Sequence, residues 1–136
     1  MNEFNFEGNL SVNASPVNWY LARILLRFEF TDEDKINLNR RCVAWENQII
    51  LKAKNPERAY EKALKHGKSK ERGEMHTLDG KRKGKWIFEG LRSLTPLYDE
   101  LDDGSEISQT EHENKTVKKI KDWVLKKEDL EVFQKN

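Results

Sequence analysis

A run of alternating residues constrains the fold of this chain more than any other feature. In "NWYLARILLRFEF", residues 18–30, one face of an extended strand would carry six apolar side chains: Tyr20, Ala22, Ile24, Leu26, Phe28 and Phe30. Arg23, Arg27 and Glu29 would lie on the other face. A period of two over a dozen residues predicts a long, half-buried strand. Because Trp19 and Leu21 are apolar as well, we expect part of the second face to be covered.

A second strand and a helix are predicted next. The segment "CVAWENQIILKAK", residues 42–54, alternates again and would place these apolar residues on one face: Val43, Trp45, Ile49, Leu51 and Ala53. The short connection between the two runs favours an antiparallel pair. Asn55 as the N-cap, Pro56 at the first helical position and Gly67 past the end predict a helix. Its apolar stripe would consist of Ala59, Tyr60, Ala63 and Leu64.

The second half of the chain predicts further strands and a last helix. Asp79-Gly80 indicates a turn, and the strand "KWIFEGLRSL" after it is apolar on both faces, which is typical of a central strand. Gly90 within this strand indicates a bulge or a close backbone approach. A short last strand is expected around Ile107. The segment "ENKTVKKIKDWVLKKEDLEVF" predicts an amphipathic helix, broken near Lys127, with Trp123 packed against the sheet.

This order of elements predicts an α+β fold. We expect a mainly antiparallel sheet of four to five strands, with one helix after the second strand and a C-terminal helix. Residues 1–16 are interpreted as a flexible N-terminal arm, residues 17–110 as the α+β domain and residues 111–136 as an amphipathic C-terminal helix or tail.

Composition narrows the class of protein. With 136 residues, four Trp, six Phe, three Tyr and a net charge of +1, the chain is expected to fold as one domain. Cys42 is the single cysteine, so no internal disulfide is possible, and its place in "CVAW" predicts a buried, inert thiol. The N-terminus has no basic start and no apolar segment, and no apolar run is long enough for a membrane span. We therefore expect a soluble, cytoplasmic protein without a cofactor or a metal.

Three blocks of sequence resemble a known family. They are "WYLARILLRFE", "WENQIILKAKNPERAYEKALKHGK" and "WIFEGLRSLTPLYDELDDGSEI". Together they resemble a family of small bacterial proteins known as domain-of-unknown-function family 4288, over roughly residues 18–108. The third block is the most specific one, because strand propensity alone does not explain its residues. The resemblance implies one compact α+β domain and brings no activity with it.

The acidic segment from Leu97 to Glu113 is the first candidate site, since it contains seven acids and no Lys or Arg. A surface of this charge suits a basic protein partner. The residues predicted to contact that partner are Tyr98, Asp99, Glu100, Asp102, Asp103 and Glu106. Two alternatives are a divalent cation site, although the spacing of an EF-hand is missing, and a plain turn at Asp102 and Asp103.

The basic segment over residues 62–85 is the second candidate site, with nine Lys or Arg against three acids. It could hold a nucleic-acid backbone next to an exposed aromatic ring. The residues predicted for that role are Lys81, Arg82, Lys83, Lys85 and Trp86. The alternative is a solvated loop and helix end.

A third possibility is a small nuclease. His66 and His76 would act as its acid and base, and Lys85 or Arg92 would hold a phosphate. Arg23 and Arg27 are further expected to pair with Glu46 or Glu89 across the sheet.

Together these features favour a non-enzymatic protein-interaction module whose partner is a protein. More specifically, they predict a toxin-neutralising, immunity-type inhibitor of a basic toxin domain. Nucleic-acid association and the nuclease remain the alternatives, and no catalytic residue is assigned.

Overall fold

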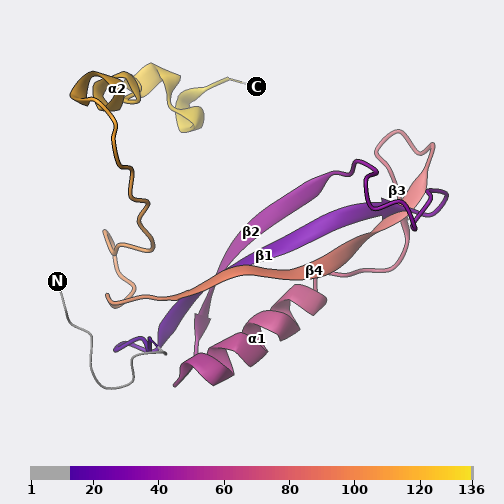
Figure 1. Ribbon diagram of the computed structural model, residues 1–136, viewed down its shortest axis with the longest axis horizontal. Coiled ribbons are helices and arrows are strands. Elements are labelled where there is room, and N and C mark those ends of the chain that lie inside the picture. Colours follow the sequence, from indigo (N-terminus) through magenta and orange to yellow (C-terminus); the bar gives the residue numbers. More distant parts are fainter. Residues whose placement is uncertain (1–12, 136) are drawn as a thin grey trace.

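The structure is a computed structural model that describes residues 13–135. It contains a four-stranded sheet in the order β2-β1-β4-β3, in which all neighbouring strands are antiparallel. The elements are β1 (Trp19–Phe30), β2 (Ala44–Lys52), α1 (Pro56–Lys68), β3 (Met75–His76), β4 (Lys83–Pro96) and α2 (Val117–Asp122), followed by two 3₁₀ turns (Lys127–Asp129 and Glu131–Phe133). The predicted α+β fold, with one helix after the second strand and a C-terminal helix, is confirmed (Figure 1).

Strand β1 is the centre of the sheet, as its length and alternation suggest. It pairs with β2 on one side and with β4 on the other along most of its length. The side chains of its predicted core face are buried at Tyr20, Ala22, Ile24, Leu26 and Phe28. Burial of this single stripe supplies much of the hydrophobic stabilisation of the domain.

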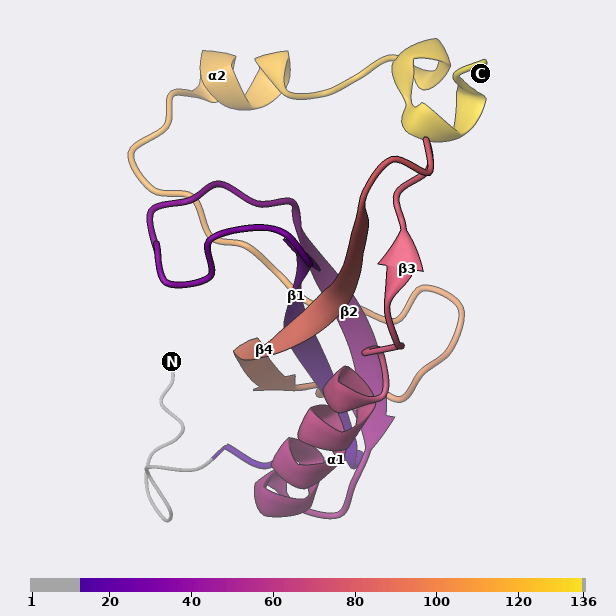
Figure 2. The same cartoon turned by 90° about the vertical axis from the view of Figure 1, so that its right-hand side faces the viewer.

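Helix α1 lies on the face of the sheet that carries these side chains (Figure 2). Its N-cap is the predicted one, because the Asn55 side chain accepts a hydrogen bond from the Arg58 amide at 2.8 Å. Ala59 and Ala63 are fully buried against the sheet, since their small side chains let the helix come close. Tyr60, predicted to belong to the same stripe, is exposed; the narrow alanine contact leaves it beside the interface.

Gly67 belongs to the last turn of α1, so the prediction that it follows the end of the helix is wrong. A Cβ atom at this position would lie 2.3 Å from the Phe88 ring of β4. The glycine is therefore needed for the close approach of helix and sheet, and Ser69 caps the helix instead.

Helix α1 covers only the half of the sheet where β1 begins (Figure 1). At the other end the same face lacks a helix, which is why Val43 and Trp45 are exposed, contrary to the predicted core face of β2. Cys42 is likewise exposed, not buried as predicted, because β2 begins only at Ala44 and leaves Cys42 in the preceding loop.

Strand β4 carries two irregularities in its pairing with β1. The register shifts between Leu25 and Leu26, opposite Glu89, and again between Arg23 and Ile24, opposite Arg92. The predicted bulge at Gly90 is thus confirmed, and this glycine has a φ of 148°. On its outer side β4 pairs with β3 only at Lys83 and Gly84, so the fully central strand is β1 rather than β4.

Residues 97–135 form no further strand, so the strand predicted around Ile107 is wrong. Pro96 ends the ladder, and Leu97 makes a last bond to Trp19 at 2.9 Å before the chain turns away.

Helix α2 is shorter than the predicted C-terminal helix and lies apart from the sheet in both views (Figures 1 and 2). Among residues 13–135 it contacts none of the strands. Trp123 packs on the His112 ring, with centroids 4.8 Å apart, so its predicted contact with the sheet is wrong. No helix in the described part of the chain is long and apolar enough to cross a membrane.

Candidate functional site

Ser15 lies just before β1 and binds the chain at the point where it leaves β4. Its hydroxyl donates to the Leu97 carbonyl at 2.5 Å and accepts from the amide of Trp19 at 3.1 Å. Its own amide donates to the Tyr20 hydroxyl at 3.0 Å. Ser15 and Leu97 are both buried, so the first and last parts of the domain are joined here. Of the arm predicted over residues 1–16, residues 1–12 lie outside the described residues, and its flexibility stays a prediction.

Residues 97–109, which we call the closing segment, form a pocket against the open face of the sheet, the face without α1. This closing pocket has a volume of about 380 Å³. Its lining comes from the sheet and from both ends of the closing segment: Arg23, Ser93, Thr95, Pro96, Leu97, Tyr98, Asp99, Glu106, Ile107, Ser108 and Gln109. Tyr98 and Ile107 are 61% and 46% exposed, so its rim offers apolar as well as charged contacts.

Two polar atoms of the sheet in this lining have no hydrogen-bond partner among the described residues. They are Arg23 Nε and Ser93 Oγ, and both atoms are buried. The nearest carboxylate oxygen, on Glu46, is 3.9 Å from Arg23 Nε, which is an ion pair but too long for a hydrogen bond. A buried donor without a partner costs about 1–3 kcal/mol, so a group bound here that accepts hydrogen bonds would be favoured.

The rest of the open face is held by ion pairs between neighbouring strands. Glu46 pairs with Arg92 at 3.3 Å as well as with Arg23. Arg27 binds Glu89, and this hydrogen bond raises the pKa of the Arg27 guanidinium above its ordinary value. The predicted pairing of both arginines across the sheet is confirmed. These pairs occupy the arginine and glutamate side chains at the middle of the open face, and exposed pairs of this kind contribute about 0–1 kcal/mol each.

The six residues predicted to contact a protein partner divide into two groups. Tyr98, Asp99 and Glu106 line the closing pocket. The other three, Glu100, Asp102 and Asp103, lie in the exposed turn between its two walls.

That turn is closed by hydrogen bonds of its own. The Asp102 amide donates to the Ser105 hydroxyl at 2.7 Å, and the Ser105 amide donates back to the Asp102 carbonyl at 2.9 Å. Gly104, with a φ of 90°, completes it. The turn therefore brings Asp99 and Glu106 to the same pocket.

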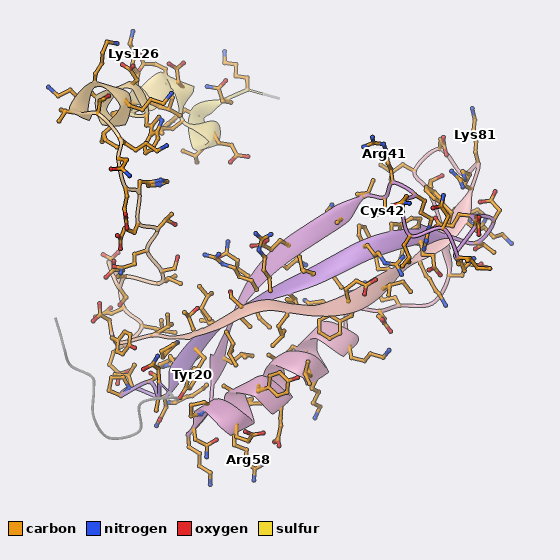
Figure 3. The ribbon with its side chains drawn as sticks, in the orientation of Figure 1. Tyr20, Arg41, Cys42, Arg58, Lys81 and Lys126 are labelled. Atoms are coloured by element: carbon orange, nitrogen blue, oxygen red, sulfur yellow. The ribbon has the colours of Figure 1, made fainter. Side chains whose placement is uncertain are left out.

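The part of the basic segment predicted to bind nucleic acid, residues 81–86, lies at the opposite end of β4. Figure 3 shows Lys81 and Tyr20 at the two ends of the sheet, and Tyr20 pairs with Pro96, next to which the closing segment begins. β4 has 14 residues, so Lys81 and Asp99, which flank it, are separated by roughly 45 Å of strand. They do not form one surface.

The five residues predicted for nucleic acid are also distributed over both faces of β4. Gly84 pairs with Phe30 on the helix face, so Lys83 and Lys85 point to the open face and Trp86 to the helix face. Arg82 is occupied by Asp32 at 2.7 Å and stacks over the Phe30 ring, and Lys81 lies in the turn. The nucleic-acid role stays a prediction.

His66 in α1 and His76 in β3 are both exposed. No hydrogen bond joins either side chain to a neighbour within residues 13–135. In that part of the chain no three His, Cys, Asp or Glu side chains gather as metal ligands would. The acid–base role of these histidines stays a prediction.

Sequence reasoning missed Ser93 and Ile107 as pocket residues. Ser93 faces the pocket only because the bulge at Arg92 changes which side chains point to each face, and Ile107 had been interpreted as part of a strand. The one available signal was the apolar side chain of Ile107 within an otherwise polar segment.

Comparison with known proteins gives one match. A family model described as a domain of unknown function (DUF4288) matches residues 19–109, which include both strands of the core pair, α1 and the closing segment. No curated protein and no solved structure matches the chain.

Proposed function

This chain belongs to the DUF4288 family, which brings no activity with it. From the closing pocket we propose that the chain is a non-enzymatic protein-interaction module that binds a basic segment of a partner protein. The observation that carries the proposal is the lining of the pocket. Two carboxylates stand at its rim and two unpartnered polar atoms lie on its sheet side.

The rim suits a lysine or arginine side chain. Such a side chain has an apolar stem and a charged head. Tyr98 and Ile107 offer apolar surface to the stem, and Asp99 and Glu106 offer carboxylates to the head. None of these four makes a hydrogen bond or ion pair through its side chain with another described residue, so binding would break no existing pair.

The sheet side of the pocket suits the main chain of the same partner. Arg23 Nε and Ser93 Oγ are buried, so both side chains would turn toward a peptide carbonyl oxygen of the partner in order to donate to it, and this contact would remove the cost of their unpartnered atoms. A charge pair at the rim and a main-chain contact below it would together fix the direction of the bound segment.

The specific form of the proposal is a toxin-neutralising inhibitor of the immunity type. Proteins that act on nucleic acid carry basic surfaces, and an acidic pocket of this kind is complementary to such a surface. Covering that surface would block the toxin without any chemistry by the inhibitor itself.

The test is an NMR titration of the ¹⁵N-labelled full chain with two capped tripeptides, one with Arg and one with Glu at its centre. The Arg peptide is expected to shift the amide signals of Ser93, Thr95 and Ile107. A double variant, Asp99→Asn with Glu106→Gln, should abolish these shifts. The control with the same charge change, Asp102→Asn with Asp103→Asn, alters the turn outside the pocket and should keep them. Equal response to both peptides, or none, would refute the pocket as a basic-segment site.

The toxin-neutralising form has a separate test. A protein captured from the native host should bind the wild type, lose binding to the Asp99/Glu106 variant, and lose its own activity in the complex. A captured partner with no toxic activity would leave the interaction module standing and refute the inhibitor.

A further inference from the structure

The two edges of the sheet differ in how well they are closed. Along β4, the short strand β3 pairs with the first residues, and the Glu71 carboxylate accepts from the Phe88 amide at 2.7 Å. Two bulges then interrupt the strand. Each of these devices prevents another strand from pairing with that edge.

Strand β2 forms the other edge and has no such protection. Its register with β1 is continuous from Ala44 to Lys52, without a bulge or a proline. In Figure 3 no element lies beside the outer side of β2. Within residues 13–135, β1 is its only pairing partner.

The hydrogen bonds at both ends of β2 show which backbone groups point outward. Phe28 donates to the Val43 carbonyl and Ala53 donates to the Asn18 carbonyl, each at 2.9 Å. Odd-numbered residues of β2 therefore bond to β1, because bonding alternates along an antiparallel strand. Even-numbered residues direct their N–H and C=O groups to the free edge: Ala44, Glu46, Gln48, Ile50 and Lys52. Of these groups, the Lys52 carbonyl alone has a partner in the described chain, the Lys62 ammonium at 2.5 Å.

We infer that β2 pairs antiparallel with β2 of a second copy of this chain, about a two-fold axis at Ile49. In this register Glu46 lies opposite Lys52, and by symmetry the pair occurs twice. Gln48 lies opposite Ile50, and these pairs exchange both of their backbone hydrogen bonds, since all four residues direct them outward. Antiparallel registers moved by two residues in either direction lose the Glu46–Lys52 pair.

This charge complementarity is what selects a second copy as the occupant, with Lys52 of that copy added to the two arginines, Arg23 and Arg92, that already pair with Glu46. Glu46 and Lys52 both lie on the open face of the sheet, opposite Leu25 and Trp19 of β1, so the new pairs would form on one side of the joined sheet. A two-fold interface uses the same surface from both subunits, and a strand that is complementary to itself meets that condition. The result is a continuous sheet of both copies with the two α1 helices on the same face, and with the closing pockets left open.

The dimer is tested by sedimentation equilibrium of the full chain over a wide range of concentration. The wild type should reach the mass of a dimer. Lys52→Glu should raise the dimer Kd about tenfold, because two like-charge contacts replace two attractive ones. Its matched control, Lys54→Glu, makes the same charge change two residues outside the register and should leave the Kd unchanged.

A second variant tests the backbone bonds. Gln48→Pro removes an N–H that points outward and not one that bonds to β1, so the monomer should keep its fold while the dimer is lost. Gln48→Ala keeps the N–H and should keep the dimer. Circular dichroism checks the fold of each variant, and Lys52→Glu alone decides the question if the proline variant does not fold.

Hydrogen exchange locates the interface. The amides of Glu46, Gln48 and Ile50 should become protected as the protein concentration rises, while the amides of Asn47 and Ile49 are protected at every concentration. A chain that stays monomeric, or a dimer whose outward amides exchange freely, would overturn the inference. So would protection of those amides in a monomer, which would mean that another part of the chain occupies the edge.

Discussion

Replacement of Gly67 by alanine tests the contact on which the packing of α1 depends. An alanine in a helix is ordinarily worth about 1 kcal/mol more than a glycine, so the local effect of this substitution favours the folded state. The new Cβ, however, would stand 2.3–2.7 Å from three atoms of the Phe88 ring. Either the ring or the helix has to move.

The cost of that movement decides the sign. The backbone of Phe88 is fixed, because Phe88 pairs with Leu26 of the central strand and its amide donates to Glu71. The ring therefore cannot move away from the helix by a shift of that backbone. Overpacking of this kind costs about 1–3 kcal/mol. Because the Cβ would stand as close as 2.3 Å to the ring, we expect the upper end of this range, so that after the gain in helix propensity the net loss is about 2 kcal/mol and the Tm falls by several degrees.

The assay is thermal and urea unfolding followed by circular dichroism, with two further variants. Gly73→Ala is the control, because no atom lies within 4 Å of a Cβ at that position, and it should be neutral or slightly stabilising. The double variant Gly67→Ala with Phe88→Leu should recover part of the loss, since it removes the ring that is struck. If Gly67→Ala proved as stable as the wild type, the close approach would not be the reason for the glycine.

Three further expectations concern other contacts. Hydrogen bonds from Lys68 and from the Phe88 amide lower the pKa of Glu71, so its stabilising contribution is complete above the pKa of an unfolded glutamate and is lost as the pH falls through the lower, folded value. Urea unfolding at a series of acidic pH values should therefore show a smaller loss of stability for Glu71→Gln than for the wild type; parallel curves would contradict this. Ser15→Ala should lower the free energy of unfolding by about 1–3 kcal/mol, because it leaves the buried Leu97 carbonyl and the Trp19 amide without their partner, and Ser15→Thr, which keeps the hydroxyl, should lose less. A chain ending at residue 113 should keep the Tm of the full chain within a few degrees, since α2 contacts no strand; a large drop on calorimetry would mean that the tail stabilises the domain.

The parts of the fold that could be predicted are those set by local patterns. The alternation from Trp19 to Phe30 determines which side chains of β1 are buried, whatever strands pair with it. Asn55 and Pro56 determine where α1 begins, because the cap needs only the amide of Arg58 three residues later.

The parts that could not be predicted depend on contacts between distant segments. Gly67 has the sequence signature of a helix end, yet its place is set by Phe88 on another element. The exposure of Trp45 depends on how far α1 extends along the sheet, and that of Cys42 on where β2 begins; the sequence of β2 specifies neither.

The candidate site shows the same division. Asp99 and Glu106 were predicted from charge alone, whereas Ser93 reaches the pocket through a bulge that alters the alternation of β4. Gly90 indicates the first bulge of β4, but no glycine or other sequence signal marks the second one, at Arg92.

The central position of β1 has a consequence for the order in which the domain can form during synthesis. β1 is the first of the described strands to be made, but Tyr20 pairs with Pro96, 76 residues later in the chain (96 − 20). Only β2 and α1 can join β1 before that. At synthesis rates of about 5–20 residues per second, the 44 residues between Lys52 and Pro96 take roughly 2–9 s to be made. During that interval one side of the most apolar strand has no partner, and long-range pairing of this kind is slow to form. The nascent chain is thus most exposed to aggregation while β4 is still being translated, and folding is completed only when Leu97 reaches Ser15.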